Sequence, residues 1–291
     1  MPAITVDPET TAARYAALAE YVGARVLGPG GDFRCEHARD CRSSIRESWR
    51  LYEGQCSYLG PHYDAADGDG RSMRILVVSM QTGRPDRHVD LEGRRLQVWG
   101  SRDRPNRGPG SRNPHMRGVA TALKVLWGIR PDSGDDGEWL PTNEGRVHLF
   151  DALAMANATL CSRIKEGSAK GQGSKTMLDR CATHLRETVR ILDPTIIHSQ
   201  GRREGGPSTH SAVLAICDEI DWISEYVARV RIGATRAVWV SLRHPSMQWG
   251  GDYLESVVVP ALERARGWRW RRGPGPISRG RPNGEGPSRG R

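Results

Sequence analysis

The sequence predicts an α/β fold: a three-layer α/β/α sandwich around a four-stranded, mostly parallel sheet. Two observations predict it. Short apolar runs rich in β-branched residues occur at 74–79, 195–198 and 237–242, and such runs are typical of parallel strands buried on both faces. Segments with helical periodicity lie between them, and strands that alternate with helices indicate a parallel sheet.

The elements follow from spacing and breaker residues. A helix is expected at 9–27, where apolar residues recur at helical spacing and Leu27-Gly-Pro-Gly-Gly31 ends it. The first strand, 74–79, leads into the loop Met80-Gln-Thr-Gly83. The later elements, in chain order, are a basic loop at 101–114, a helix from about Met116 to Trp127, an apolar element at 147–156 that ends at Asn157, a helix at 176–192, strand 195–198, a helix at about 209–230, strand 237–242 and a last helix at about 252–266.

Three polar side chains follow strands of this predicted sheet. Gln81 follows the first strand, Asn157 ends the second, and His244 follows the fourth. In open α/β sheets the loops beyond the carboxyl ends of the strands build the ligand site. We therefore expect Gln81, Asn157 and His244 to converge there.

The chain length and charge define the expected domains. The 291 residues suffice for one sizeable domain, expected at 31–265, preceded by an N-terminal helical segment, 1–30. Residues 266–291 carry eight arginines and one acid, +7 of the net charge of +9, and are rich in Gly and Pro. We expect a disordered basic tail, which either attracts polyanions or only aids solubility.

The expected environment is the cytoplasm. No apolar stretch reaches the roughly 18 residues that a membrane span needs, and the first residues lack a basic region followed by an apolar one. We therefore expect a soluble, cytoplasmic monomer with no membrane partner.

Cysteine spacing gives the first chemical signal. The six cysteines of a cytoplasmic chain are not expected to form disulfides, and Cys217 lies in an apolar run where a buried thiol is expected. Asn157 is followed after three residues by Cys161 and, nineteen residues later, by Cys181. This stretch indicates a metal or cluster site beside an amide suited to reading a nucleobase edge.

The order of these motifs resembles the uracil-DNA glycosylase superfamily over residues 35–264. The shared features are a strand with a short Gly loop, Asn-x3-Cys, a Cys before a helix, the Pro194-Thr-Ile-Ile197 strand and a strand ending in His-Pro-Ser246. The resemblance is closest to the iron–sulfur branches of bacteria and archaea. It implies DNA as the partner and hydrolysis of the bond between sugar and uracil, or a related deaminated base.

Two features depart from that pattern. The iron–sulfur branches carry Gly-Glu-x-Pro-Gly after the first strand, where the glutamate activates water, but this chain has Ser79-Met-Gln-Thr-Gly83. The loop looks more like that of the single-strand-selective uracil glycosylases, in which an amide positions the water. The first cysteine pair also differs, because Cys35 and Cys41 are separated by five residues rather than two.

The resemblance assigns roles to the site residues. His244 would donate to the carbonyl oxygen of the departing base, whose negative charge must be stabilised. Asn157 would read the pairing edge of uracil, Gln81 would orient the attacking water, and Gly83 and Ser246 would contact the substrate. The alternatives are a structural histidine, a capping or turn asparagine and an ordinary loop glutamine.

The resemblance also implies a [4Fe–4S] cluster held by Cys35, Cys41, Cys161 and Cys181, with a structural role. Cys56 is an alternative to Cys35 or Cys41. A zinc site is the chemical alternative, although zinc pairs are commonly separated by two to four residues.

Contacts to DNA are expected from the basic loop. A flipped base needs backbone contacts that hold the distorted strand. The candidates are Arg102, Arg104, Arg107 and Arg112, unless the charge run is only a solvated face. His115 is a weak candidate for the aromatic that stacks on uracil. The alternatives to a uracil glycosylase are a catalytically inactive nucleic-acid-binding relative and a glycosylase for another damaged base.

Overall fold

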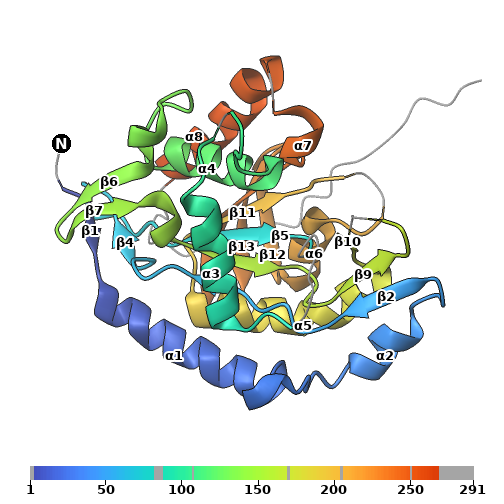
Figure 1. Cartoon of the computed structure of the whole chain (residues 1–291). Coiled ribbons are helices and arrows are strands. Elements are labelled where there is room, and N and C mark those ends of the chain that lie inside the picture. The colour runs from blue at the N-terminus through green and yellow to red at the C-terminus, as the bar shows by residue number, and fades with distance from the viewer. Residues whose placement is uncertain are drawn as a thin grey trace, which may run out of the picture.

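A mixed β-sheet forms the centre of the molecule. The computed structural model describes residues 3–81, 88–106, 108–168, 171–203, 206–249 and 251–268. Within these residues one sheet contains seven strands, whereas the sequence predicted four (Figure 1). In spatial order the strands are β12 (Glu219–Ser224), β13 (Val227–Ile232), β14 (Thr235–Leu242), β11 (Ile196–Gln200), β5 (Ile75–Ser79), β8 (Leu153–Asn157) and β3 (Tyr58–Leu59).

The four central strands are those that the sequence predicted. β14, β11, β5 and β8 pair in parallel, and every residue of β11, β5 and β8 is buried. A strand buried on both faces needs apolar or internally bonded side chains at almost every position, which explains the continuous apolar runs. The predicted sheet is therefore the parallel centre of a wider one, since β3, β13 and β12 add antiparallel edges.

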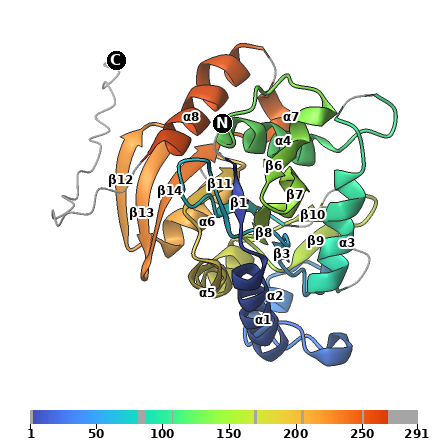
Figure 2. The same cartoon turned by 90° about the vertical axis from the view of Figure 1, so that its left-hand side faces the viewer.

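Helices cover both faces of the sheet (Figure 2). In β5, Ile75 and Val77 join the core beneath α4 and α8, whereas Leu76 and Val78 join the core beneath α1, α5 and α6. This alternation is the two-residue period of a strand. The helices are α1 (Pro8–Arg25), α2 (Ala38–Ser43), α3 (Leu91–Arg102), α4 (Pro114–Leu126), α5 (Lys175–Leu192), α6 (Thr209–Ile216), α7 (Pro245–Gln248) and α8 (Val259–Gly267).

The predicted helix at 209–230 is wrong beyond its first two turns. α6 ends at Ile216, and the chain continues as the antiparallel hairpin β12–β13. In β13 the buried residues Val230 and Ile232 alternate with the half-buried Arg229 and Arg231, a period of two rather than 3.6. Val230 and Ile232 therefore lie on one face of a strand.

Short polar caps fix where the helices begin. The Asp90 side chain accepts a hydrogen bond from the Gly93 amide at the start of α3, a helix that the sequence analysis did not include. Asn113 caps α4 in the same way, with Pro114 at its first position. Each cap satisfies an amide that has no partner within the helix. The predicted basic loop therefore starts inside α3, and Arg102 is the last residue of that helix.

Smaller sheets and short helices surround this core. The small sheets are β1 (Thr5–Val6) with β4 (Ala65–Ala66), β6 (Trp139–Thr142) with β7 (Gly145–His148), and β10 (Gly171–Gln172) with β9 (Ser162–Lys165) and β2 (Trp49–Tyr52). The short helices are three 3₁₀ turns, Pro29–Gly31, Asp135–Glu138 and Leu149–Asp151, and a π-helix, Leu254–Val258.

Among the residues that the structure describes, none of the helices combines the length and the apolar character that crossing a membrane requires. Leu18 and Val22 of α1 belong to the core beneath the sheet, together with α5 residues. Of the predicted tail, residues 269–291 lie outside the described part.

Leucine truncation tests the packing of α4 against the sheet. Leu123→Ala should lower the free energy of unfolding by about 2–5 kcal/mol, because Leu123 is fully buried and its loss leaves a cavity. Leu96→Ala is the matched control, because Leu96 on α3 is 59% exposed. Urea denaturation measures both, and equal losses would contradict the described core.

Candidate functional site

The candidate site lies where the order of the parallel strands reverses. In spatial order, the four parallel strands β8, β5, β11 and β14 are the second, first, third and fourth along the chain. β5 and β11 are neighbours whose chain connections leave toward opposite edges of the sheet. Such a switch point opens a crevice beyond the carboxyl ends of the strands, which is the common ligand site of these sheets.

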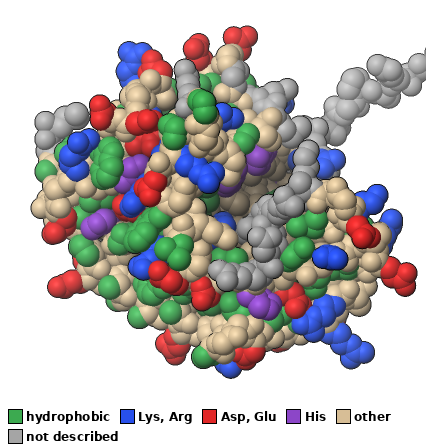
Figure 3. All heavy atoms as spheres, viewed as in Figure 1, with side chains coloured by type: hydrophobic (Ala, Val, Ile, Leu, Met, Phe, Trp, Pro, Cys, Tyr) green, Lys and Arg blue, Asp and Glu red, His purple; other side chains and the backbone are tan. Residues whose placement is uncertain are grey.

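A cavity of about 880 Å³ occupies this position. It begins at Ser79, the last residue of β5, and at Gln200, the last residue of β11, and α3, α4 and the segment after β14 contribute to its wall. Figure 3 shows a hollow on this face, beside basic and histidine side chains. The volume suits a ligand of nucleoside size.

The cavity wall is basic. Arg94, Arg202 and Arg203 line it together with two histidines, and none of its described lining residues is an aspartate or glutamate. Arg202 is paired with Glu225 and Arg94 donates to Gln97. Guanidinium groups around a concave surface whose described lining holds no carboxylate still favour an anionic ligand.

His244 lies in the cavity wall at the start of α7. Its Nδ1 accepts a hydrogen bond from the Ser246 amide at 3.2 Å, and the Ser246 hydroxyl lies 2.7 Å from the same nitrogen. Burial lowers the pKa of His244 below its ordinary value, so the ring is neutral at pH 7. A neutral ring whose Nδ1 accepts must carry its proton on Nε2. Ser246, predicted to contact substrate, thus also orients His244.

His115 forms the other half of a histidine pair. Its ring stacks on that of His244, with centroids 5.7 Å apart and planes 16° from parallel. Its Nε2 lies 3.0 Å from the Ser79 hydroxyl. Burial, and then the neighbouring His244, lower the pKa of His115 to about 3, so both rings are neutral. The sequence marked His115 only as a weak stacking candidate, and the structure places it beside the predicted catalytic histidine.

Gln81 lines the cavity where the sequence placed it. Its Nε2 donates to the Gly171 carbonyl at 2.8 Å, which fixes the direction of the amide. The carbonyl Oε1 is buried and has no hydrogen-bond partner among the described residues. Gly83, predicted to contact substrate, lies outside the described residues.

Asn157 lies next to the cavity rather than in its described wall. It is buried at the end of β8, directly opposite Ser79 in the parallel register. Its Nδ2 donates to the Gln55 carbonyl at 3.4 Å. The amides of Ala158 and Thr159 bond the carbonyls of Ser79 and Met80, so the two strand ends are held together. The structure therefore brings Gln81 and His244 to one cavity and Asn157 to its border.

The four predicted cysteine ligands gather at one end of the molecule. Cys35 and Cys41 lie in and before α2, Cys161 follows β8, and Cys181 is on α5. All are free thiols, and three are buried. Burial first, and then Cys181 and Cys41, raise the pKa of Cys161. Burial also raises the pKa of Cys181 to about 12, with smaller effects of Cys41 and Cys35, so the four thiols are electrostatic neighbours.

Cys56 stands apart from this group. Its amide donates to the Val89 carbonyl, and after burial the charge that raises its pKa, to about 12, is that of Asp90. None of the other four thiols is among the charges that shift the pKa of Cys56, although it packs in the same apolar cluster as Cys181.

The donor set fits a thiolate-bound group in kind and number. Four thiols from three chain segments are the usual set for a [4Fe–4S] cluster or a structural zinc. The Leu160 amide also donates to the Cys181 sulfur at 3.4 Å. Across the described residues, however, no three His, Cys, Asp or Glu side chains are placed to hold a metal ion as they stand.

The prediction that Arg112 contacts DNA is wrong. The side chain is 3% exposed, and both oxygens of Glu138 and the carbonyls of Ser101 and Arg102 accept its hydrogen bonds, as does Asn106 Oδ1. These contacts use all five guanidinium N–H donors. Arg112 therefore has no donor left for a phosphate, and it holds the α3–α4 segment instead.

The other arginines of this segment differ in exposure. Arg102 is half-buried and pairs with Asp103 and Asp151, while Arg104 is exposed. Arg107 lies outside the described residues. Of the predicted phosphate contacts, Arg104 is thus the most accessible of those described.

Sequence reasoning missed Gln200 and the cavity arginines. Gln200 ends β11, is buried, and has its Nε2 3.1 Å from Nε2 of His198. The rule that selected Gln81 and Asn157, a polar residue at a strand's carboxyl end, also selects Gln200 once β11 extends to residue 200. Arg94 had no such signal, because the sequence analysis did not include its helix.

A glycine controls how closely α4 approaches His244. A Cβ at Gly118 would lie 2.8 Å from Cβ of Pro245 and closer to its Cγ, so Gly118→Ala must displace the segment that holds His244. We expect a loss of about 1–3 kcal/mol in unfolding free energy. Gly100→Ala on α3, where nothing lies within 4 Å, should instead stabilise by about 0.5–1 kcal/mol. Urea denaturation measures both, and equal effects would contradict this close contact.

Comparison of the chain with protein-family models finds no match, and comparison with curated proteins finds no similar sequence.

Proposed function

We propose that this protein is a DNA glycosylase that hydrolyses the bond between deoxyribose and uracil, or a related deaminated base. The observation that carries the proposal is the neutral His244, held with its proton on Nε2 in the wall of a basic cavity. Cleavage of this bond leaves negative charge on the base. A fixed donor aimed at the base carbonyl stabilises that charge in the transition state.

The remaining steps of the hydrolysis do not require a carboxylate on the protein as general base. The sugar passes through an oxocarbenium-like state, which a weakly activated water can attack. The proton that this water loses neutralises the anionic base that has departed. Gln81 orients this water through Oε1, a buried atom without a hydrogen-bond partner among the described residues, since its Nε2 is bonded to Gly171. An amide does not take up a proton, so the chemistry is slower than with a carboxylate. Asn157, at the border of the cavity, would read the pairing edge of the base.

The arginines favour a nucleic acid over a free base. Arg94, Arg202 and Arg203 line the cavity, and none of its described lining residues is a carboxylate. Free uracil has no negative charge that these arginines could neutralise. The phosphates on either side of a flipped nucleotide have such a charge. The four thiols would hold a [4Fe–4S] cluster, or zinc as the alternative, bracing the loops after β8.

The absence of a carboxylate from the described wall also supports a second candidate. An inactive relative would keep the basic cavity and bind DNA without turnover. A glycosylase for another damaged base is the third candidate function. One experiment distinguishes the three candidates.

Oligonucleotides with uracil or hypoxanthine, single- and double-stranded, would be incubated with the protein and treated with alkali. We expect strand breakage at uracil that falls about 10²–10³-fold in His244→Ala. Gln81→Glu should raise the rate by about 10²-fold, since it supplies a general base. Gln97→Glu, in the same wall, is the control for added charge. Binding without breakage of any substrate would support the inactive relative instead.

Metal analysis tests the cofactor separately. The purified protein should contain about four iron and four sulfide per chain, for the cluster chemistry of four cysteine ligands. Cys161→Ser should lose this iron, whereas Cys56→Ser, equally buried, should keep it. Stoichiometric zinc would support the alternative site, and a metal-free chain that is still folded would refute both.

A further inference from the structure

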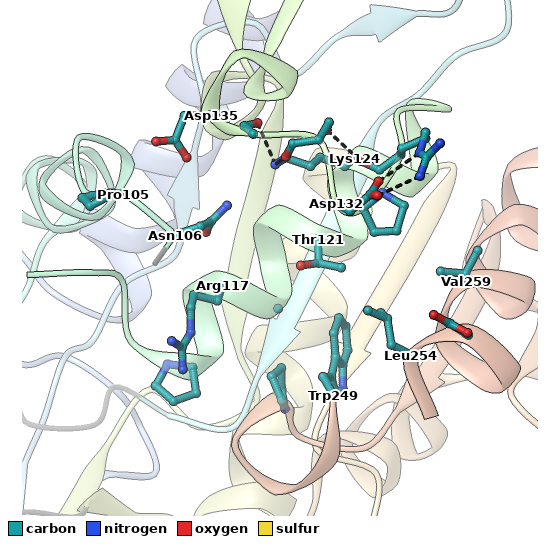
Figure 4. A pocket seen from close by; sticks show the side chains of 18 residues that line it. Pro105, Asn106, Arg117, Thr121, Lys124, Asp132, Asp135, Trp249, Leu254 and Val259 are labelled. Atoms are coloured by element: carbon teal, nitrogen blue, oxygen red, sulfur yellow. Dashed lines mark hydrogen bonds and ion pairs between the residues drawn. The ribbon is translucent and has the colours of Figure 1, made fainter. Parts of the chain in front are cut away.

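A second cavity, of about 700 Å³, lies on the other side of the first turn of α4 (Figure 4). The two cavities share Pro114. Along α4, Met116 lines the first cavity and Arg117 the second, and after β14 His244 lines the first and Pro245 the second. Only the first turn of α4 and the short segment after β14 therefore separate the two cavities, and together they form the partition between them.

One wall of the second cavity is aromatic and apolar. The Trp249 Nε1–H donates to the Arg243 carbonyl at 2.8 Å, which fixes the indole. On the core side the ring centroid is 6.1 Å from that of His198. Leu254 stands beside Trp249 in the cavity (Figure 4). With its N–H already bonded, the indole offers a ligand only its ring face, a surface that suits a flat ring.

The backbone at this wall is unusual. Leu254 is the first residue of the π-helix Leu254–Val258, which continues into α8. π-helical turns are rare, and they occur frequently at functional sites. The π-helix is a feature of the backbone and does not depend on how the cavity is defined.

The facing wall is polar. Arg117 from α4, Asp135 from the 3₁₀ turn Asp135–Glu138 and Glu255 from the π-helix are exposed, and none of the three has a hydrogen-bond or ion-pair partner in the part of the chain described here. The Lys124 ammonium is already bonded to the Ser133 and Gly134 carbonyls, and Arg130 pairs with Asp132. Among the described residues, Arg117 thus supplies a cation without a partner, and Asp135 and Glu255 supply two such carboxylates.

We propose that the second cavity binds the nucleotide adjacent to the target base in single-stranded DNA. This proposal rests on the proposed function and names the strand state of its substrate. The neighbouring base stacks on Trp249, and an amino group on its edge donates to Asp135. The phosphate that links the two nucleotides crosses the partition near Pro114 and meets Arg117. A base paired inside a duplex cannot stack on Trp249, so single strands bind more tightly.

Photocrosslinking tests the stacking contact without needing turnover. Single-stranded oligonucleotides would carry 5-iodocytosine at one position at a time on either side of a uracil, and mass spectrometry would locate the crosslink. We expect a crosslink to Trp249 from one flanking position, absent with the duplex. No crosslink to Trp249 from any flanking position would overturn the proposal.

Affinity measurements give a second, independent test. Trp249→Leu should weaken single-strand binding about tenfold. Arg117→Gln, which breaks no described contact, should weaken it severalfold and lower the salt slope by about 0.7. Arg25→Gln, an exposed arginine of α1 on the opposite face of the sheet, is the matched control. Equal behaviour of Arg117→Gln and Arg25→Gln would overturn the phosphate contact.

The two proposals fail separately. If uracil is not excised but the crosslink to Trp249 forms, the nucleotide subsite stands and the hydrolase does not. If uracil is excised at equal rates from single and double strands and Trp249→Leu binds normally, the hydrolase stands and the subsite is refuted.

Discussion

Burial of four parallel strands on both faces is the constraint on which the rest of the structure depends. β14, β11, β5 and β8 have no solvent-facing side, so helices must cover the sheet above and below. Parallel pairing also brings all four carboxyl ends to one edge. The side chains of Ser79, Asn157, Gln200 and the segment after Leu242 therefore meet there whatever the length of the connections.

This constraint explains what the sequence predicted and what it did not. A strand buried on both faces leaves a continuous apolar run, so 74–79 and 237–242 were recognisable. β13 is a short antiparallel strand with half-buried arginines at alternate positions, and so short a run does not by itself separate a strand from a helix. α3 has an exposed leucine and arginines on several sides, so no apolar stripe marked it.

The candidate site was predictable only to the level of backbone position. Residues at strand ends, Gln81 and His244, were placed correctly at the cavity because topology alone puts them there. Arg112 was not placed correctly, because the sequence does not show which residue its guanidinium group pairs with. Glu138, 26 residues away in the chain, engages this guanidinium in a buried ion pair. Tertiary contacts of this kind carry no local signal.

The saturated guanidinium of Arg112 also bears on how the molecule meets a ligand. It fixes the segment that leads into Asn113, and thereby the start of α4, on which His115 and Arg117 are carried. The conformational entropy of this segment is lost when the chain folds. A ligand that reaches the cavity therefore meets a helix start that is already ordered, and little of its interaction free energy is spent on ordering α4.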